Sequence, residues 1–221
     1  INKIAKVDKV IKVLENIKNK FDKKTKNVSL ADLIVLAGNT AVEKAAKKSG
    51  HKIKVPFMQG RGDAKQEQTD VFSFNLLEPK ADGFVNYHKS KLTTSPEEML
   101  IDKAQLMQLT GPEMTVLFGG MRVLGTNFDG SNYGVFTKKV GTLTNDYFKN
   151  LLDMNITWSD KDDKEQYFQG KNRKTNKVIW EGSRVDLIFG SNSQLRAIAE
   201  VYASDDSNAK FIKDFAKVWS K

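Results

Sequence analysis

Apolar residues return at helical spacing in several separate stretches of this chain, and this pattern restricts the fold more than any other feature. Between residues 3 and 22 they recur every three or four positions, with lysines largely on the other faces. Such spacing predicts an amphipathic helix. The apolar positions are Ile4, Val7, Ile11, Leu14, Ile17 and Phe21.

A second helix is expected directly after Ser29, because serine is a good N-cap and Asp32 stands three positions further on. Ser49 and Gly50 signal its end. The stretch from residue 30 to 36 is nearly continuous in apolar residues, so this helix is predicted to be buried on most sides. Residues 51–93 keep no helical period, and we expect a long ordered loop there with a short helix near residues 65–72.

Helical signals resume after residue 93. Pro96 is typical of the first helical position, and Thr110 begins another start signal. Gly119 and Gly120 allow very close packing. We predict helices over residues 94–109, from residue 110 onward, and over residues 144–154, 192–202 and 205–220.

Residues 155–182 are polar with aromatic residues spaced through them, which favours short antiparallel strands. We predict strands at residues 156–159, 165–169 and 178–181, with a turn over 171–177. The predicted fold class is therefore mainly α, a single domain over residues 1–221 with a small β insertion at residues 155–182.

The basic charge is concentrated at one end of the chain. Of the formal net charge of +9, all lies in residues 1–54, which hold 14 lysines and 5 acidic residues. A surface of this kind can bind nucleic acid or an anionic membrane. However, these residues contain no arginine and one aromatic residue, Phe21, so we favour a solvated helix face and expect neither partner.

No catalytic constellation is evident from residue types and spacing. The chain has no cysteine, and its two histidines, His51 and His88, lack a second ligand at metal-binding spacing. Arg61-Gly62-Asp63 spells a cell-adhesion tripeptide, but three residues are weak evidence and the glycine fits a turn. The acid pair Asp162/Asp163 lies in a polar loop.

Five longer stretches resemble bacterial catalase-peroxidases, and together they extend over essentially the whole chain. They are residues 29–43 (SLADLIVLAGNTAVE), 55–64 (VPFMQGRGDA), 109–127 (LTGPEMTVLFGGMRVLGTN), 146–154 (DYFKNLLDM) and 180–196 (WEGSRVDLIFGSNSQLR).

The resemblance implies a haem-peroxidase-like helical fold. The family carries two tandem copies of that fold, of which the N-terminal copy binds haem b and the C-terminal copy has lost it. The present chain resembles about the last two-thirds of the C-terminal copy, so we expect it to start inside a domain and to expose apolar surface. The resemblance further implies a bacterial cytoplasmic protein, a homodimer, in which this domain packs on the N-terminal haem domain.

Three positions bear on whether haem is bound. In the haem-bearing copy, the Gly-Gly pair precedes the histidine that ligates iron, whereas Met121 follows it here. By the same alignment, Leu143 stands at a tryptophan beside that histidine, and Arg184 stands at the aspartate that orients it. The resemblance thus implies a degenerate proximal site, with no catalytic, cofactor-binding or metal-ligating residue.

We therefore expect a non-catalytic structural domain that supports the N-terminal haem domain. On this interpretation the chain alone is no enzyme, whereas the parent is a haem-dependent oxidoreductase acting on hydrogen peroxide. One alternative is a peroxidase domain that binds haem with Met121 as axial ligand, since a thioether can ligate iron. Another is binding of nucleic acid or a membrane surface through residues 1–54.

Overall fold

The computed structural model describes residues 4–22, 26–89, 94–161 and 165–221, and it is mainly helical with small antiparallel sheets. The fold class predicted from the sequence is confirmed. The elements are α1 (Ile4–Phe21), α2 (Leu30–Lys48), the 3₁₀ turn η1 (Gln66–Gln68), α3 (Val71–Leu76), β1 (Ala81–Asp82), the 3₁₀ turn η2 (Gly83–Val85), β2 (Tyr87–His88), α4 (Pro96–Leu106), α5 (Gly111–Leu124), α6 (Asp146–Leu151), β3 (Ile156–Asp160), β4 (Tyr167–Asn172), β5 (Val178–Ser183), α7 (Arg184–Ser191), α8 (Ser193–Ala203) and α9 (Asn208–Trp219).

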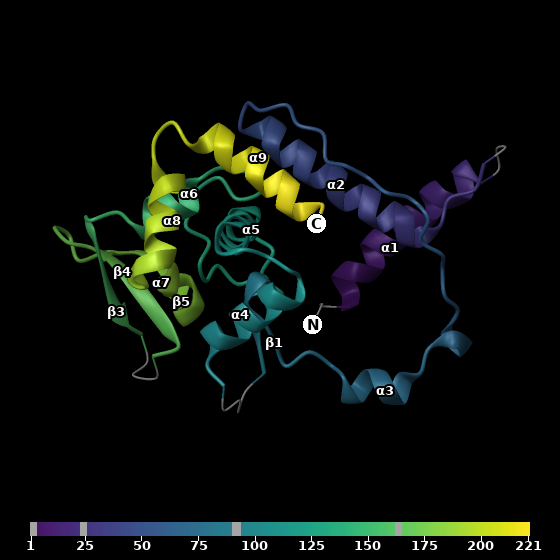
Figure 1. The fold of residues 1–221 in the computed structure, drawn as a ribbon, viewed down its shortest axis with the longest axis horizontal. Helices are drawn as coiled ribbons and strands as arrows, with labels where there is room; N and C mark the ends of the chain where they lie inside the picture. Colours follow the sequence, from purple (N-terminus) through teal and green to yellow (C-terminus); the bar gives the residue numbers. More distant parts are fainter. Residues whose placement is uncertain (1–3, 23–25, 90–93, 162–164) are drawn as a thin grey trace.

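Helix α5 lies in the middle of the fold, where α6, α8, α9 and the turn η2 pack against it (Figure 1). Nine of its residues are buried, among them Phe118 and the pair Gly119–Gly120. A Cβ atom on Gly119 would lie 2.5 Å from the ring of Phe148, and one on Gly120 would lie 2.1 Å from the ring of Phe215. The two glycines therefore let α6 and α9 approach the α5 backbone, as the sequence predicted.

Helix α9 lies alongside α2 although the two helices are far apart in the sequence (Figure 1). A hydrogen bond between their side chains joins them. The indole Nε1 of Trp219 donates a hydrogen bond of 3.0 Å to Oδ1 of Asn39. Asn39 is buried and also donates to the carbonyl of Pro56. A polar residue in the middle of a helix is thus fully used, because each of its two polar atoms has a partner.

The first two helices are less buried than the sequence indicated. Helix α2 begins as predicted, with Ser29 as N-cap, but Ile34 and Leu36 are 43% and 41% exposed. The prediction that α2 is buried on most sides is wrong. Consecutive apolar residues place side chains all around a helix, whereas only one face of α2 packs against the core. In α1, Leu14 is the apolar residue that is buried among those whose side chains are described. The valines and isoleucines of this helix in that part are partly or largely exposed.

The long loop after α2 is held in place by carboxylates. Asp32 accepts hydrogen bonds from the backbone N–H groups of Gly60 and Arg61, and Asp63 accepts from those of Leu30 and Ala31. These bonds explain how a long segment with little regular structure stays ordered against α2. The short helix expected near residues 65–72 is present as η1 and α3, while residues 90–93 lie outside the described part of the chain.

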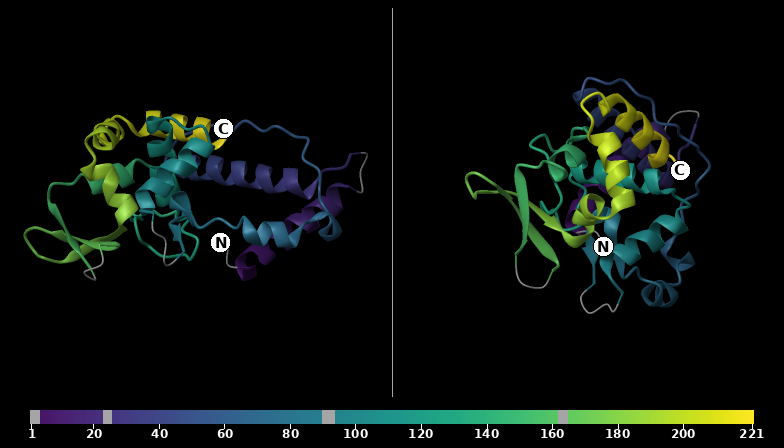
Figure 2. Two further views of the ribbon diagram at one scale, coloured as in Figure 1. Left: turned by 60° about the horizontal axis from the view of Figure 1, so that its bottom comes forward. Right: turned by 60° about the vertical axis from the view of Figure 1, so that its left-hand side comes forward.

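Strands β3, β4 and β5 form an antiparallel sheet in that order. The three antiparallel strands predicted from the sequence are present, although β4 ends later than expected, at Asn172. The sheet lies at one end of the long axis, and α1 and α3 lie at the other (Figure 2). The turn between β4 and β5 is shorter than expected, because the Asn172 side chain accepts hydrogen bonds from the N–H groups of Lys174 and Thr175. Asp162 and Asp163 lie outside the described residues.

Helix α7 was not predicted. It follows β5 without a linking loop and is capped by Ser183, whose N–H and hydroxyl both bond Asp186. The sequence analysis ended the β element at residue 182 and resumed a helix only at residue 192. Among the described residues, no helix is long and apolar enough to cross a membrane.

Candidate functional site

The most distinctive polar arrangement of the fold lies at the C-terminal end of α5, directly after Gly119 and Gly120. Met121 is half-buried and faces an open, mostly apolar pocket of about 330 Å³, where Phe84, Val218 and Trp219 are among its neighbours. Arg122, the next residue of α5, is completely buried. The residue expected at an axial-ligand position thus lies beside a buried cation.

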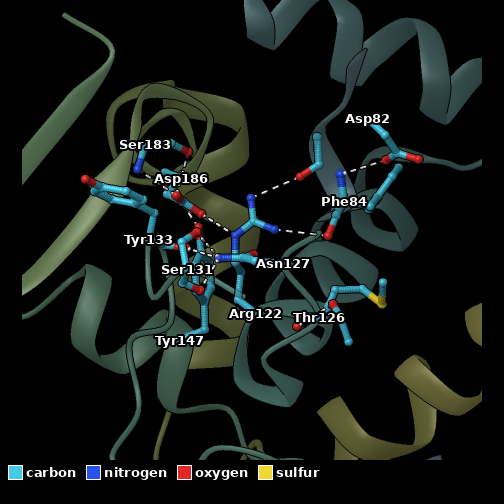
Figure 3. Close-up of polar contacts among 12 residues, drawn as sticks. Asp82, Phe84, Arg122, Thr126, Asn127, Ser131, Tyr133, Tyr147, Ser183 and Asp186 are labelled. Carbon is cyan, nitrogen blue, oxygen red and sulfur yellow. Dashed lines mark hydrogen bonds and ion pairs between the residues drawn. The ribbon is translucent and has the colours of Figure 1, made fainter. Parts of the chain in front are cut away.

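Arg122 uses its whole guanidinium group within the core (Figure 3). Its Nε donates a hydrogen bond of 2.7 Å to Oδ1 of Asp186, and Nη1 and Nη2 each donate 3.0 Å bonds to the carbonyls of Phe84 and Gly83. The guanidinium carbon lies 4.1 Å from the centre of the Phe118 ring, in a cation–π contact. A single side chain therefore joins α5, α7 and the turn η2.

Asp186 is equally buried and equally engaged. Oδ1 accepts from Arg122, while Oδ2 accepts from the N–H and the hydroxyl of Ser183 at 2.8 and 2.6 Å. Its backbone carbonyl accepts from the hydroxyl of Tyr147. Burial, together with the nearby Asp186 charge, raises the pKa of Tyr147 well above its usual range, so this hydroxyl remains protonated.

This geometry suits a structural ion pair rather than a reactive one. Removing two charges from water is costly, and the cost is offset here because both oxygens of Asp186 and all three nitrogens of Arg122 have partners. A group whose hydrogen bonds are all taken by the protein is poorly placed to exchange a proton with a substrate. Nothing in the pocket on the Met121 side adds a titratable histidine or tyrosine.

The three positions predicted to be a degenerate proximal site each have a different setting, and Met121 lines the apolar pocket described above. Leu143 is fully buried, and its N–H donates to the carbonyl of Ala45 beneath α2. Arg184 is 41% exposed at the start of α7, where its Nε lies 2.7 Å from Glu97 and its Nη1 lies 3.3 Å from Glu165. The carboxylate that lies beside Arg122 is Asp186, two positions after Arg184.

Sequence reasoning missed both Arg122 and Asp186, although signals existed for each. The spacing Ser183-x-x-Asp186 is a capping-box pattern, and it would have predicted both α7 and a hydrogen-bonded carboxylate. Arg122 interrupts an otherwise apolar helix segment, and a cation there requires a buried partner.

The two histidines lie far apart in sequence and in different settings. His51 Nε2 is 3.2 Å from the side-chain amide of Asn208, and His88 belongs to β2. Within the described ranges, no group of three or more histidine, cysteine, aspartate or glutamate residues could hold a metal ion.

The adhesion tripeptide has a local structural role. Asp63 holds the N-terminus of α2 through its two backbone hydrogen bonds, and these bonds lower its pKa. Arg61 contacts the carboxylate of Asp32 at 3.0 Å. The charged groups of the tripeptide therefore bind α2, whereas no turn is assigned at Gly62.

Comparison with known proteins identifies the class to which this fold belongs. The peroxidase family matches residues 2–205, which is most of the chain. The chain is therefore a member of the peroxidase family.

Within that family, its similar relatives are catalase-peroxidases. It is 58% identical to a catalase-peroxidase of Christiangramia forsetii over 226 residues and 57% identical to one of Rhizobium rhizogenes over 224 residues. The match covers all of this chain but about 30% of each relative. Catalase-peroxidase 2 of Alkaliphilus metalliredigens is 56% identical, and 52% of its length is covered. The resemblance to catalase-peroxidases stated from the sequence is confirmed.

Proposed function

We propose that this chain is a haem-free, non-catalytic structural domain of a catalase-peroxidase, equivalent to about the last two-thirds of its C-terminal peroxidase-like domain. In the complete protein, the N-terminal domain holds haem b and disposes of hydrogen peroxide. The present domain packs on that haem domain and keeps its active site competent, within a homodimer in the bacterial cytoplasm.

The buried Arg122–Asp186 pair is the observation that carries this proposal. Haem-peroxidase chemistry on the proximal side needs a basic axial ligand and a carboxylate free to orient it. Here the adjoining ligand position is Met121, and the carboxylate of Asp186 is bound to the Arg122 guanidinium instead. The side chains present therefore do not fit a haem.

The position of Asp186 also changes how the site is compared with haem-bearing relatives. We assign Asp186, rather than Arg184, as the counterpart of the orienting carboxylate, because it alone of the two lies against α5. On this assignment the carboxylate is retained and its partner has changed. The haem-binding features would then be lost because Met121 replaces the iron-ligating histidine and Arg122 binds the carboxylate, and not because Arg184 replaces the carboxylate.

Hemin titration tests the absence of haem binding. We expect no stoichiometric Soret shift and no peroxidase turnover when the purified protein is titrated with hemin. The variant Met121→Leu serves as the matched control, because it removes the thioether that could ligate iron. A stoichiometric shift in the native protein that Met121→Leu abolishes would establish the axial-ligand alternative instead.

The supporting role needs a separate experiment. The haem-bearing remainder of a catalase-peroxidase relative, produced without its equivalent of this chain, is mixed with the present protein at increasing ratios. We expect a saturable gain in catalase activity, and no gain with an unrelated basic protein of similar size. Equal activity with and without the chain would contradict the supporting role while leaving the haem-free assignment intact.

A further inference from the structure

Two tyrosine rings pack against each other at the start of strand β4. The ring centres of Tyr133 and Tyr167 lie 4.4 Å apart with 33° between the ring planes, so the two rings are in van der Waals contact. The chain has five tyrosines, and the aromatic neighbours described for the other three are phenylalanines. In the described part of the chain, Tyr133 and Tyr167 are therefore the two phenols that lie side by side.

Backbone hydrogen bonds hold the segments that carry these two tyrosines. Tyr167 begins β4 and is paired within the sheet. The loop that carries Tyr133 is bound to β5, because the N–H of Gly134 donates a 2.8 Å bond to the carbonyl of Glu181. The side-chain amide of Asn127 donates a 2.9 Å bond to the carbonyl of Tyr133. The ring contact thus joins two segments that the fold already keeps together.

The side chain of Lys161 also restricts the Tyr133 ring. Its ammonium donates a hydrogen bond of 3.0 Å to the Tyr133 hydroxyl and lies 5.1 Å from the centre of that ring. The same ammonium lies 2.7 Å from the carboxylate of Glu181 in β5. These contacts hold the Tyr133 ring at the sheet, where Tyr167 lies.

Solvent reaches this pair of phenols, in contrast to two of the other tyrosines. Tyr133 and Tyr167 both line a pocket of about 140 Å³, and Tyr167 is 39% exposed. Tyr147 is completely buried, and Tyr202 is 4% exposed. The chain has no cysteine, whose thiol would be a competing site of oxidation. An oxidant in solution therefore has access to a phenol pair and meets no thiol of this chain.

We propose that Tyr133 and Tyr167 form a site of oxidative cross-linking, in which a carbon–carbon bond joins the two rings at positions ortho to their hydroxyls. A one-electron oxidant removes one electron from each tyrosine, and each phenolic proton is released to water. The two phenoxyl radicals couple, and the hydrogens on the joined carbons move to the oxygens, which restores both phenols. Hydrogen peroxide, acting through a haem peroxidase, takes up the two electrons and two protons and becomes two water molecules.

The geometry favours a bond within one molecule over a bond between two molecules. A radical on either ring lies against its partner, so coupling does not wait for a collision. The natural occurrence of the bond rests on the proposed function, because the parent enzyme handles hydrogen peroxide at a haem. The reactivity of the pair does not rest on it, because the oxidant can be supplied from outside.

Treatment of the purified protein with hydrogen peroxide and a separate haem peroxidase tests the proposal. We expect a monomeric product that has lost two hydrogen atoms and shows dityrosine fluorescence. Proteolysis should yield two peptides joined through Tyr133 and Tyr167. The yield per molecule should stay the same when the protein is diluted about tenfold, because intramolecular coupling does not depend on concentration. The same product without added peroxidase would contradict the non-catalytic role and leave the cross-linking site standing.

Tyr133→Phe and Tyr167→Phe each remove one hydroxyl and keep the ring, so each should lower the yield of this product about tenfold or more. Tyr87→Phe is the matched control, because Tyr87 lines the same pocket but packs against Phe128, and it should leave the yield unchanged. Thermal melts establish that the variants are folded. If Tyr133→Phe alters the melt by removing the acceptor of Lys161, Tyr167→Phe still tests the pair.

Two results would overturn the proposal. The first is the absence of a lighter monomer, with dityrosine confined to covalent dimers of the chain. The second is a monomeric cross-link that persists in both Tyr133→Phe and Tyr167→Phe, which would place the reaction at other tyrosines.

Discussion

Arg122 combines features that are rarely found together in a side chain of the protein interior. It is fully buried, it is charged, and its partners come from two segments distant in sequence. The protein interior stabilises a charge poorly. The main energetic effect of losing Arg122 would therefore be that the buried Asp186 carboxylate is left without a cation.

Arg122→Met should lower the free energy of unfolding by about 3–5 kcal/mol, because it leaves the Asp186 carboxylate buried without its cation. Urea denaturation measures the change. Arg196→Met, at a surface pair with Glu200, is the control and should cost less than about 1 kcal/mol. Adding Asp186→Asn to Arg122→Met should restore part of the loss, and a double variant as unstable as the sum of both singles would contradict this explanation.

Sequence reasoning at the residue scale succeeded where chemistry is local. Ser29, Pro96 and Thr110 were all recognised as signals of helix starts, because a helix start is defined by its immediate neighbours. It failed for Arg122 and Asp186, whose partnership joins positions 64 residues apart and leaves no periodic trace.

At the scale of elements, the N-terminus of α2 has an unusual second cap. Ser29 accepts from the N–H of Asp32, and the distant Asp63 accepts from Leu30 and Ala31 at 2.8 and 2.9 Å. A carboxylate at this end also interacts favourably with the helix dipole. The loop that carries Asp63 and the helix thereby stabilise each other.

Asp63→Asn should lower the melting temperature of the protein, because it removes the negative charge and one of two acceptor atoms at this helix end. Thermal denaturation measures the shift. Asp206→Asn, at an exposed turn before α9, is the control and should leave the melting temperature unchanged. Equal melting temperatures for Asp63→Asn and the native protein would show that Ser29 alone caps α2.

The start of α5 predicts a pH dependence. The backbone N–H of Thr110, followed by the ammonium of Lys221, holds the pKa of Glu113 at about 2. A carboxyl whose pKa is lower in the folded state stabilises the fold above its unfolded value near 4.5, and this contribution is lost as the pH falls toward 2. Glu113→Gln should therefore reduce the fall in stability between pH 5 and pH 2.

Urea denaturation across that pH range tests the Glu113 prediction. Glu67→Gln, at an exposed position on η1, provides the matched control and should retain the native pH profile. Parallel profiles for Glu113→Gln and the native protein would exclude a contribution from this carboxyl.

Helices with a regular repeat of apolar residues were predicted well. Short helices that follow a strand without a loop were not. Helix α9 has a nearly complete apolar face, whereas α7 has eight residues and follows directly from a strand. Its apolar residues could equally extend the strand, because a short apolar run does not distinguish the two structures. The capping-box spacing of Ser183 and Asp186 is the local signal that distinguishes a helix from a strand here.

At the scale of the whole molecule, α1 and α3 lie at one end (Figure 2). Both segments carry exposed apolar side chains. On α1, Val10, Val13 and Ile17 form a stripe on one side of the helix. On and beside α3, large apolar residues are exposed at Phe72, Phe74, Leu76 and Leu77. Contiguous surfaces of this kind mark sites of association, which agrees with the expectation from the sequence.

The isolated protein should therefore self-associate in a concentration-dependent way. Light scattering after size exclusion measures the mass, and the combined variant Val10→Ser/Ile17→Ser should shift the population toward monomer. Val178→Ser, on the edge of the sheet at the opposite end, is the control and should not. A native protein that remains monomeric at all concentrations would contradict the prediction.

The buried arginine also has a consequence for the order in which the chain folds. Its contacts close loops of 38 and 64 residues, so the network forms only after the intervening helices have been positioned. Once formed, it joins the small turn η2 to the central helix, although that turn has few regular hydrogen bonds of its own. In native-state hydrogen exchange, the amide of Phe84 should therefore open together with the amides of α5, in the slowest cooperative unit of the molecule.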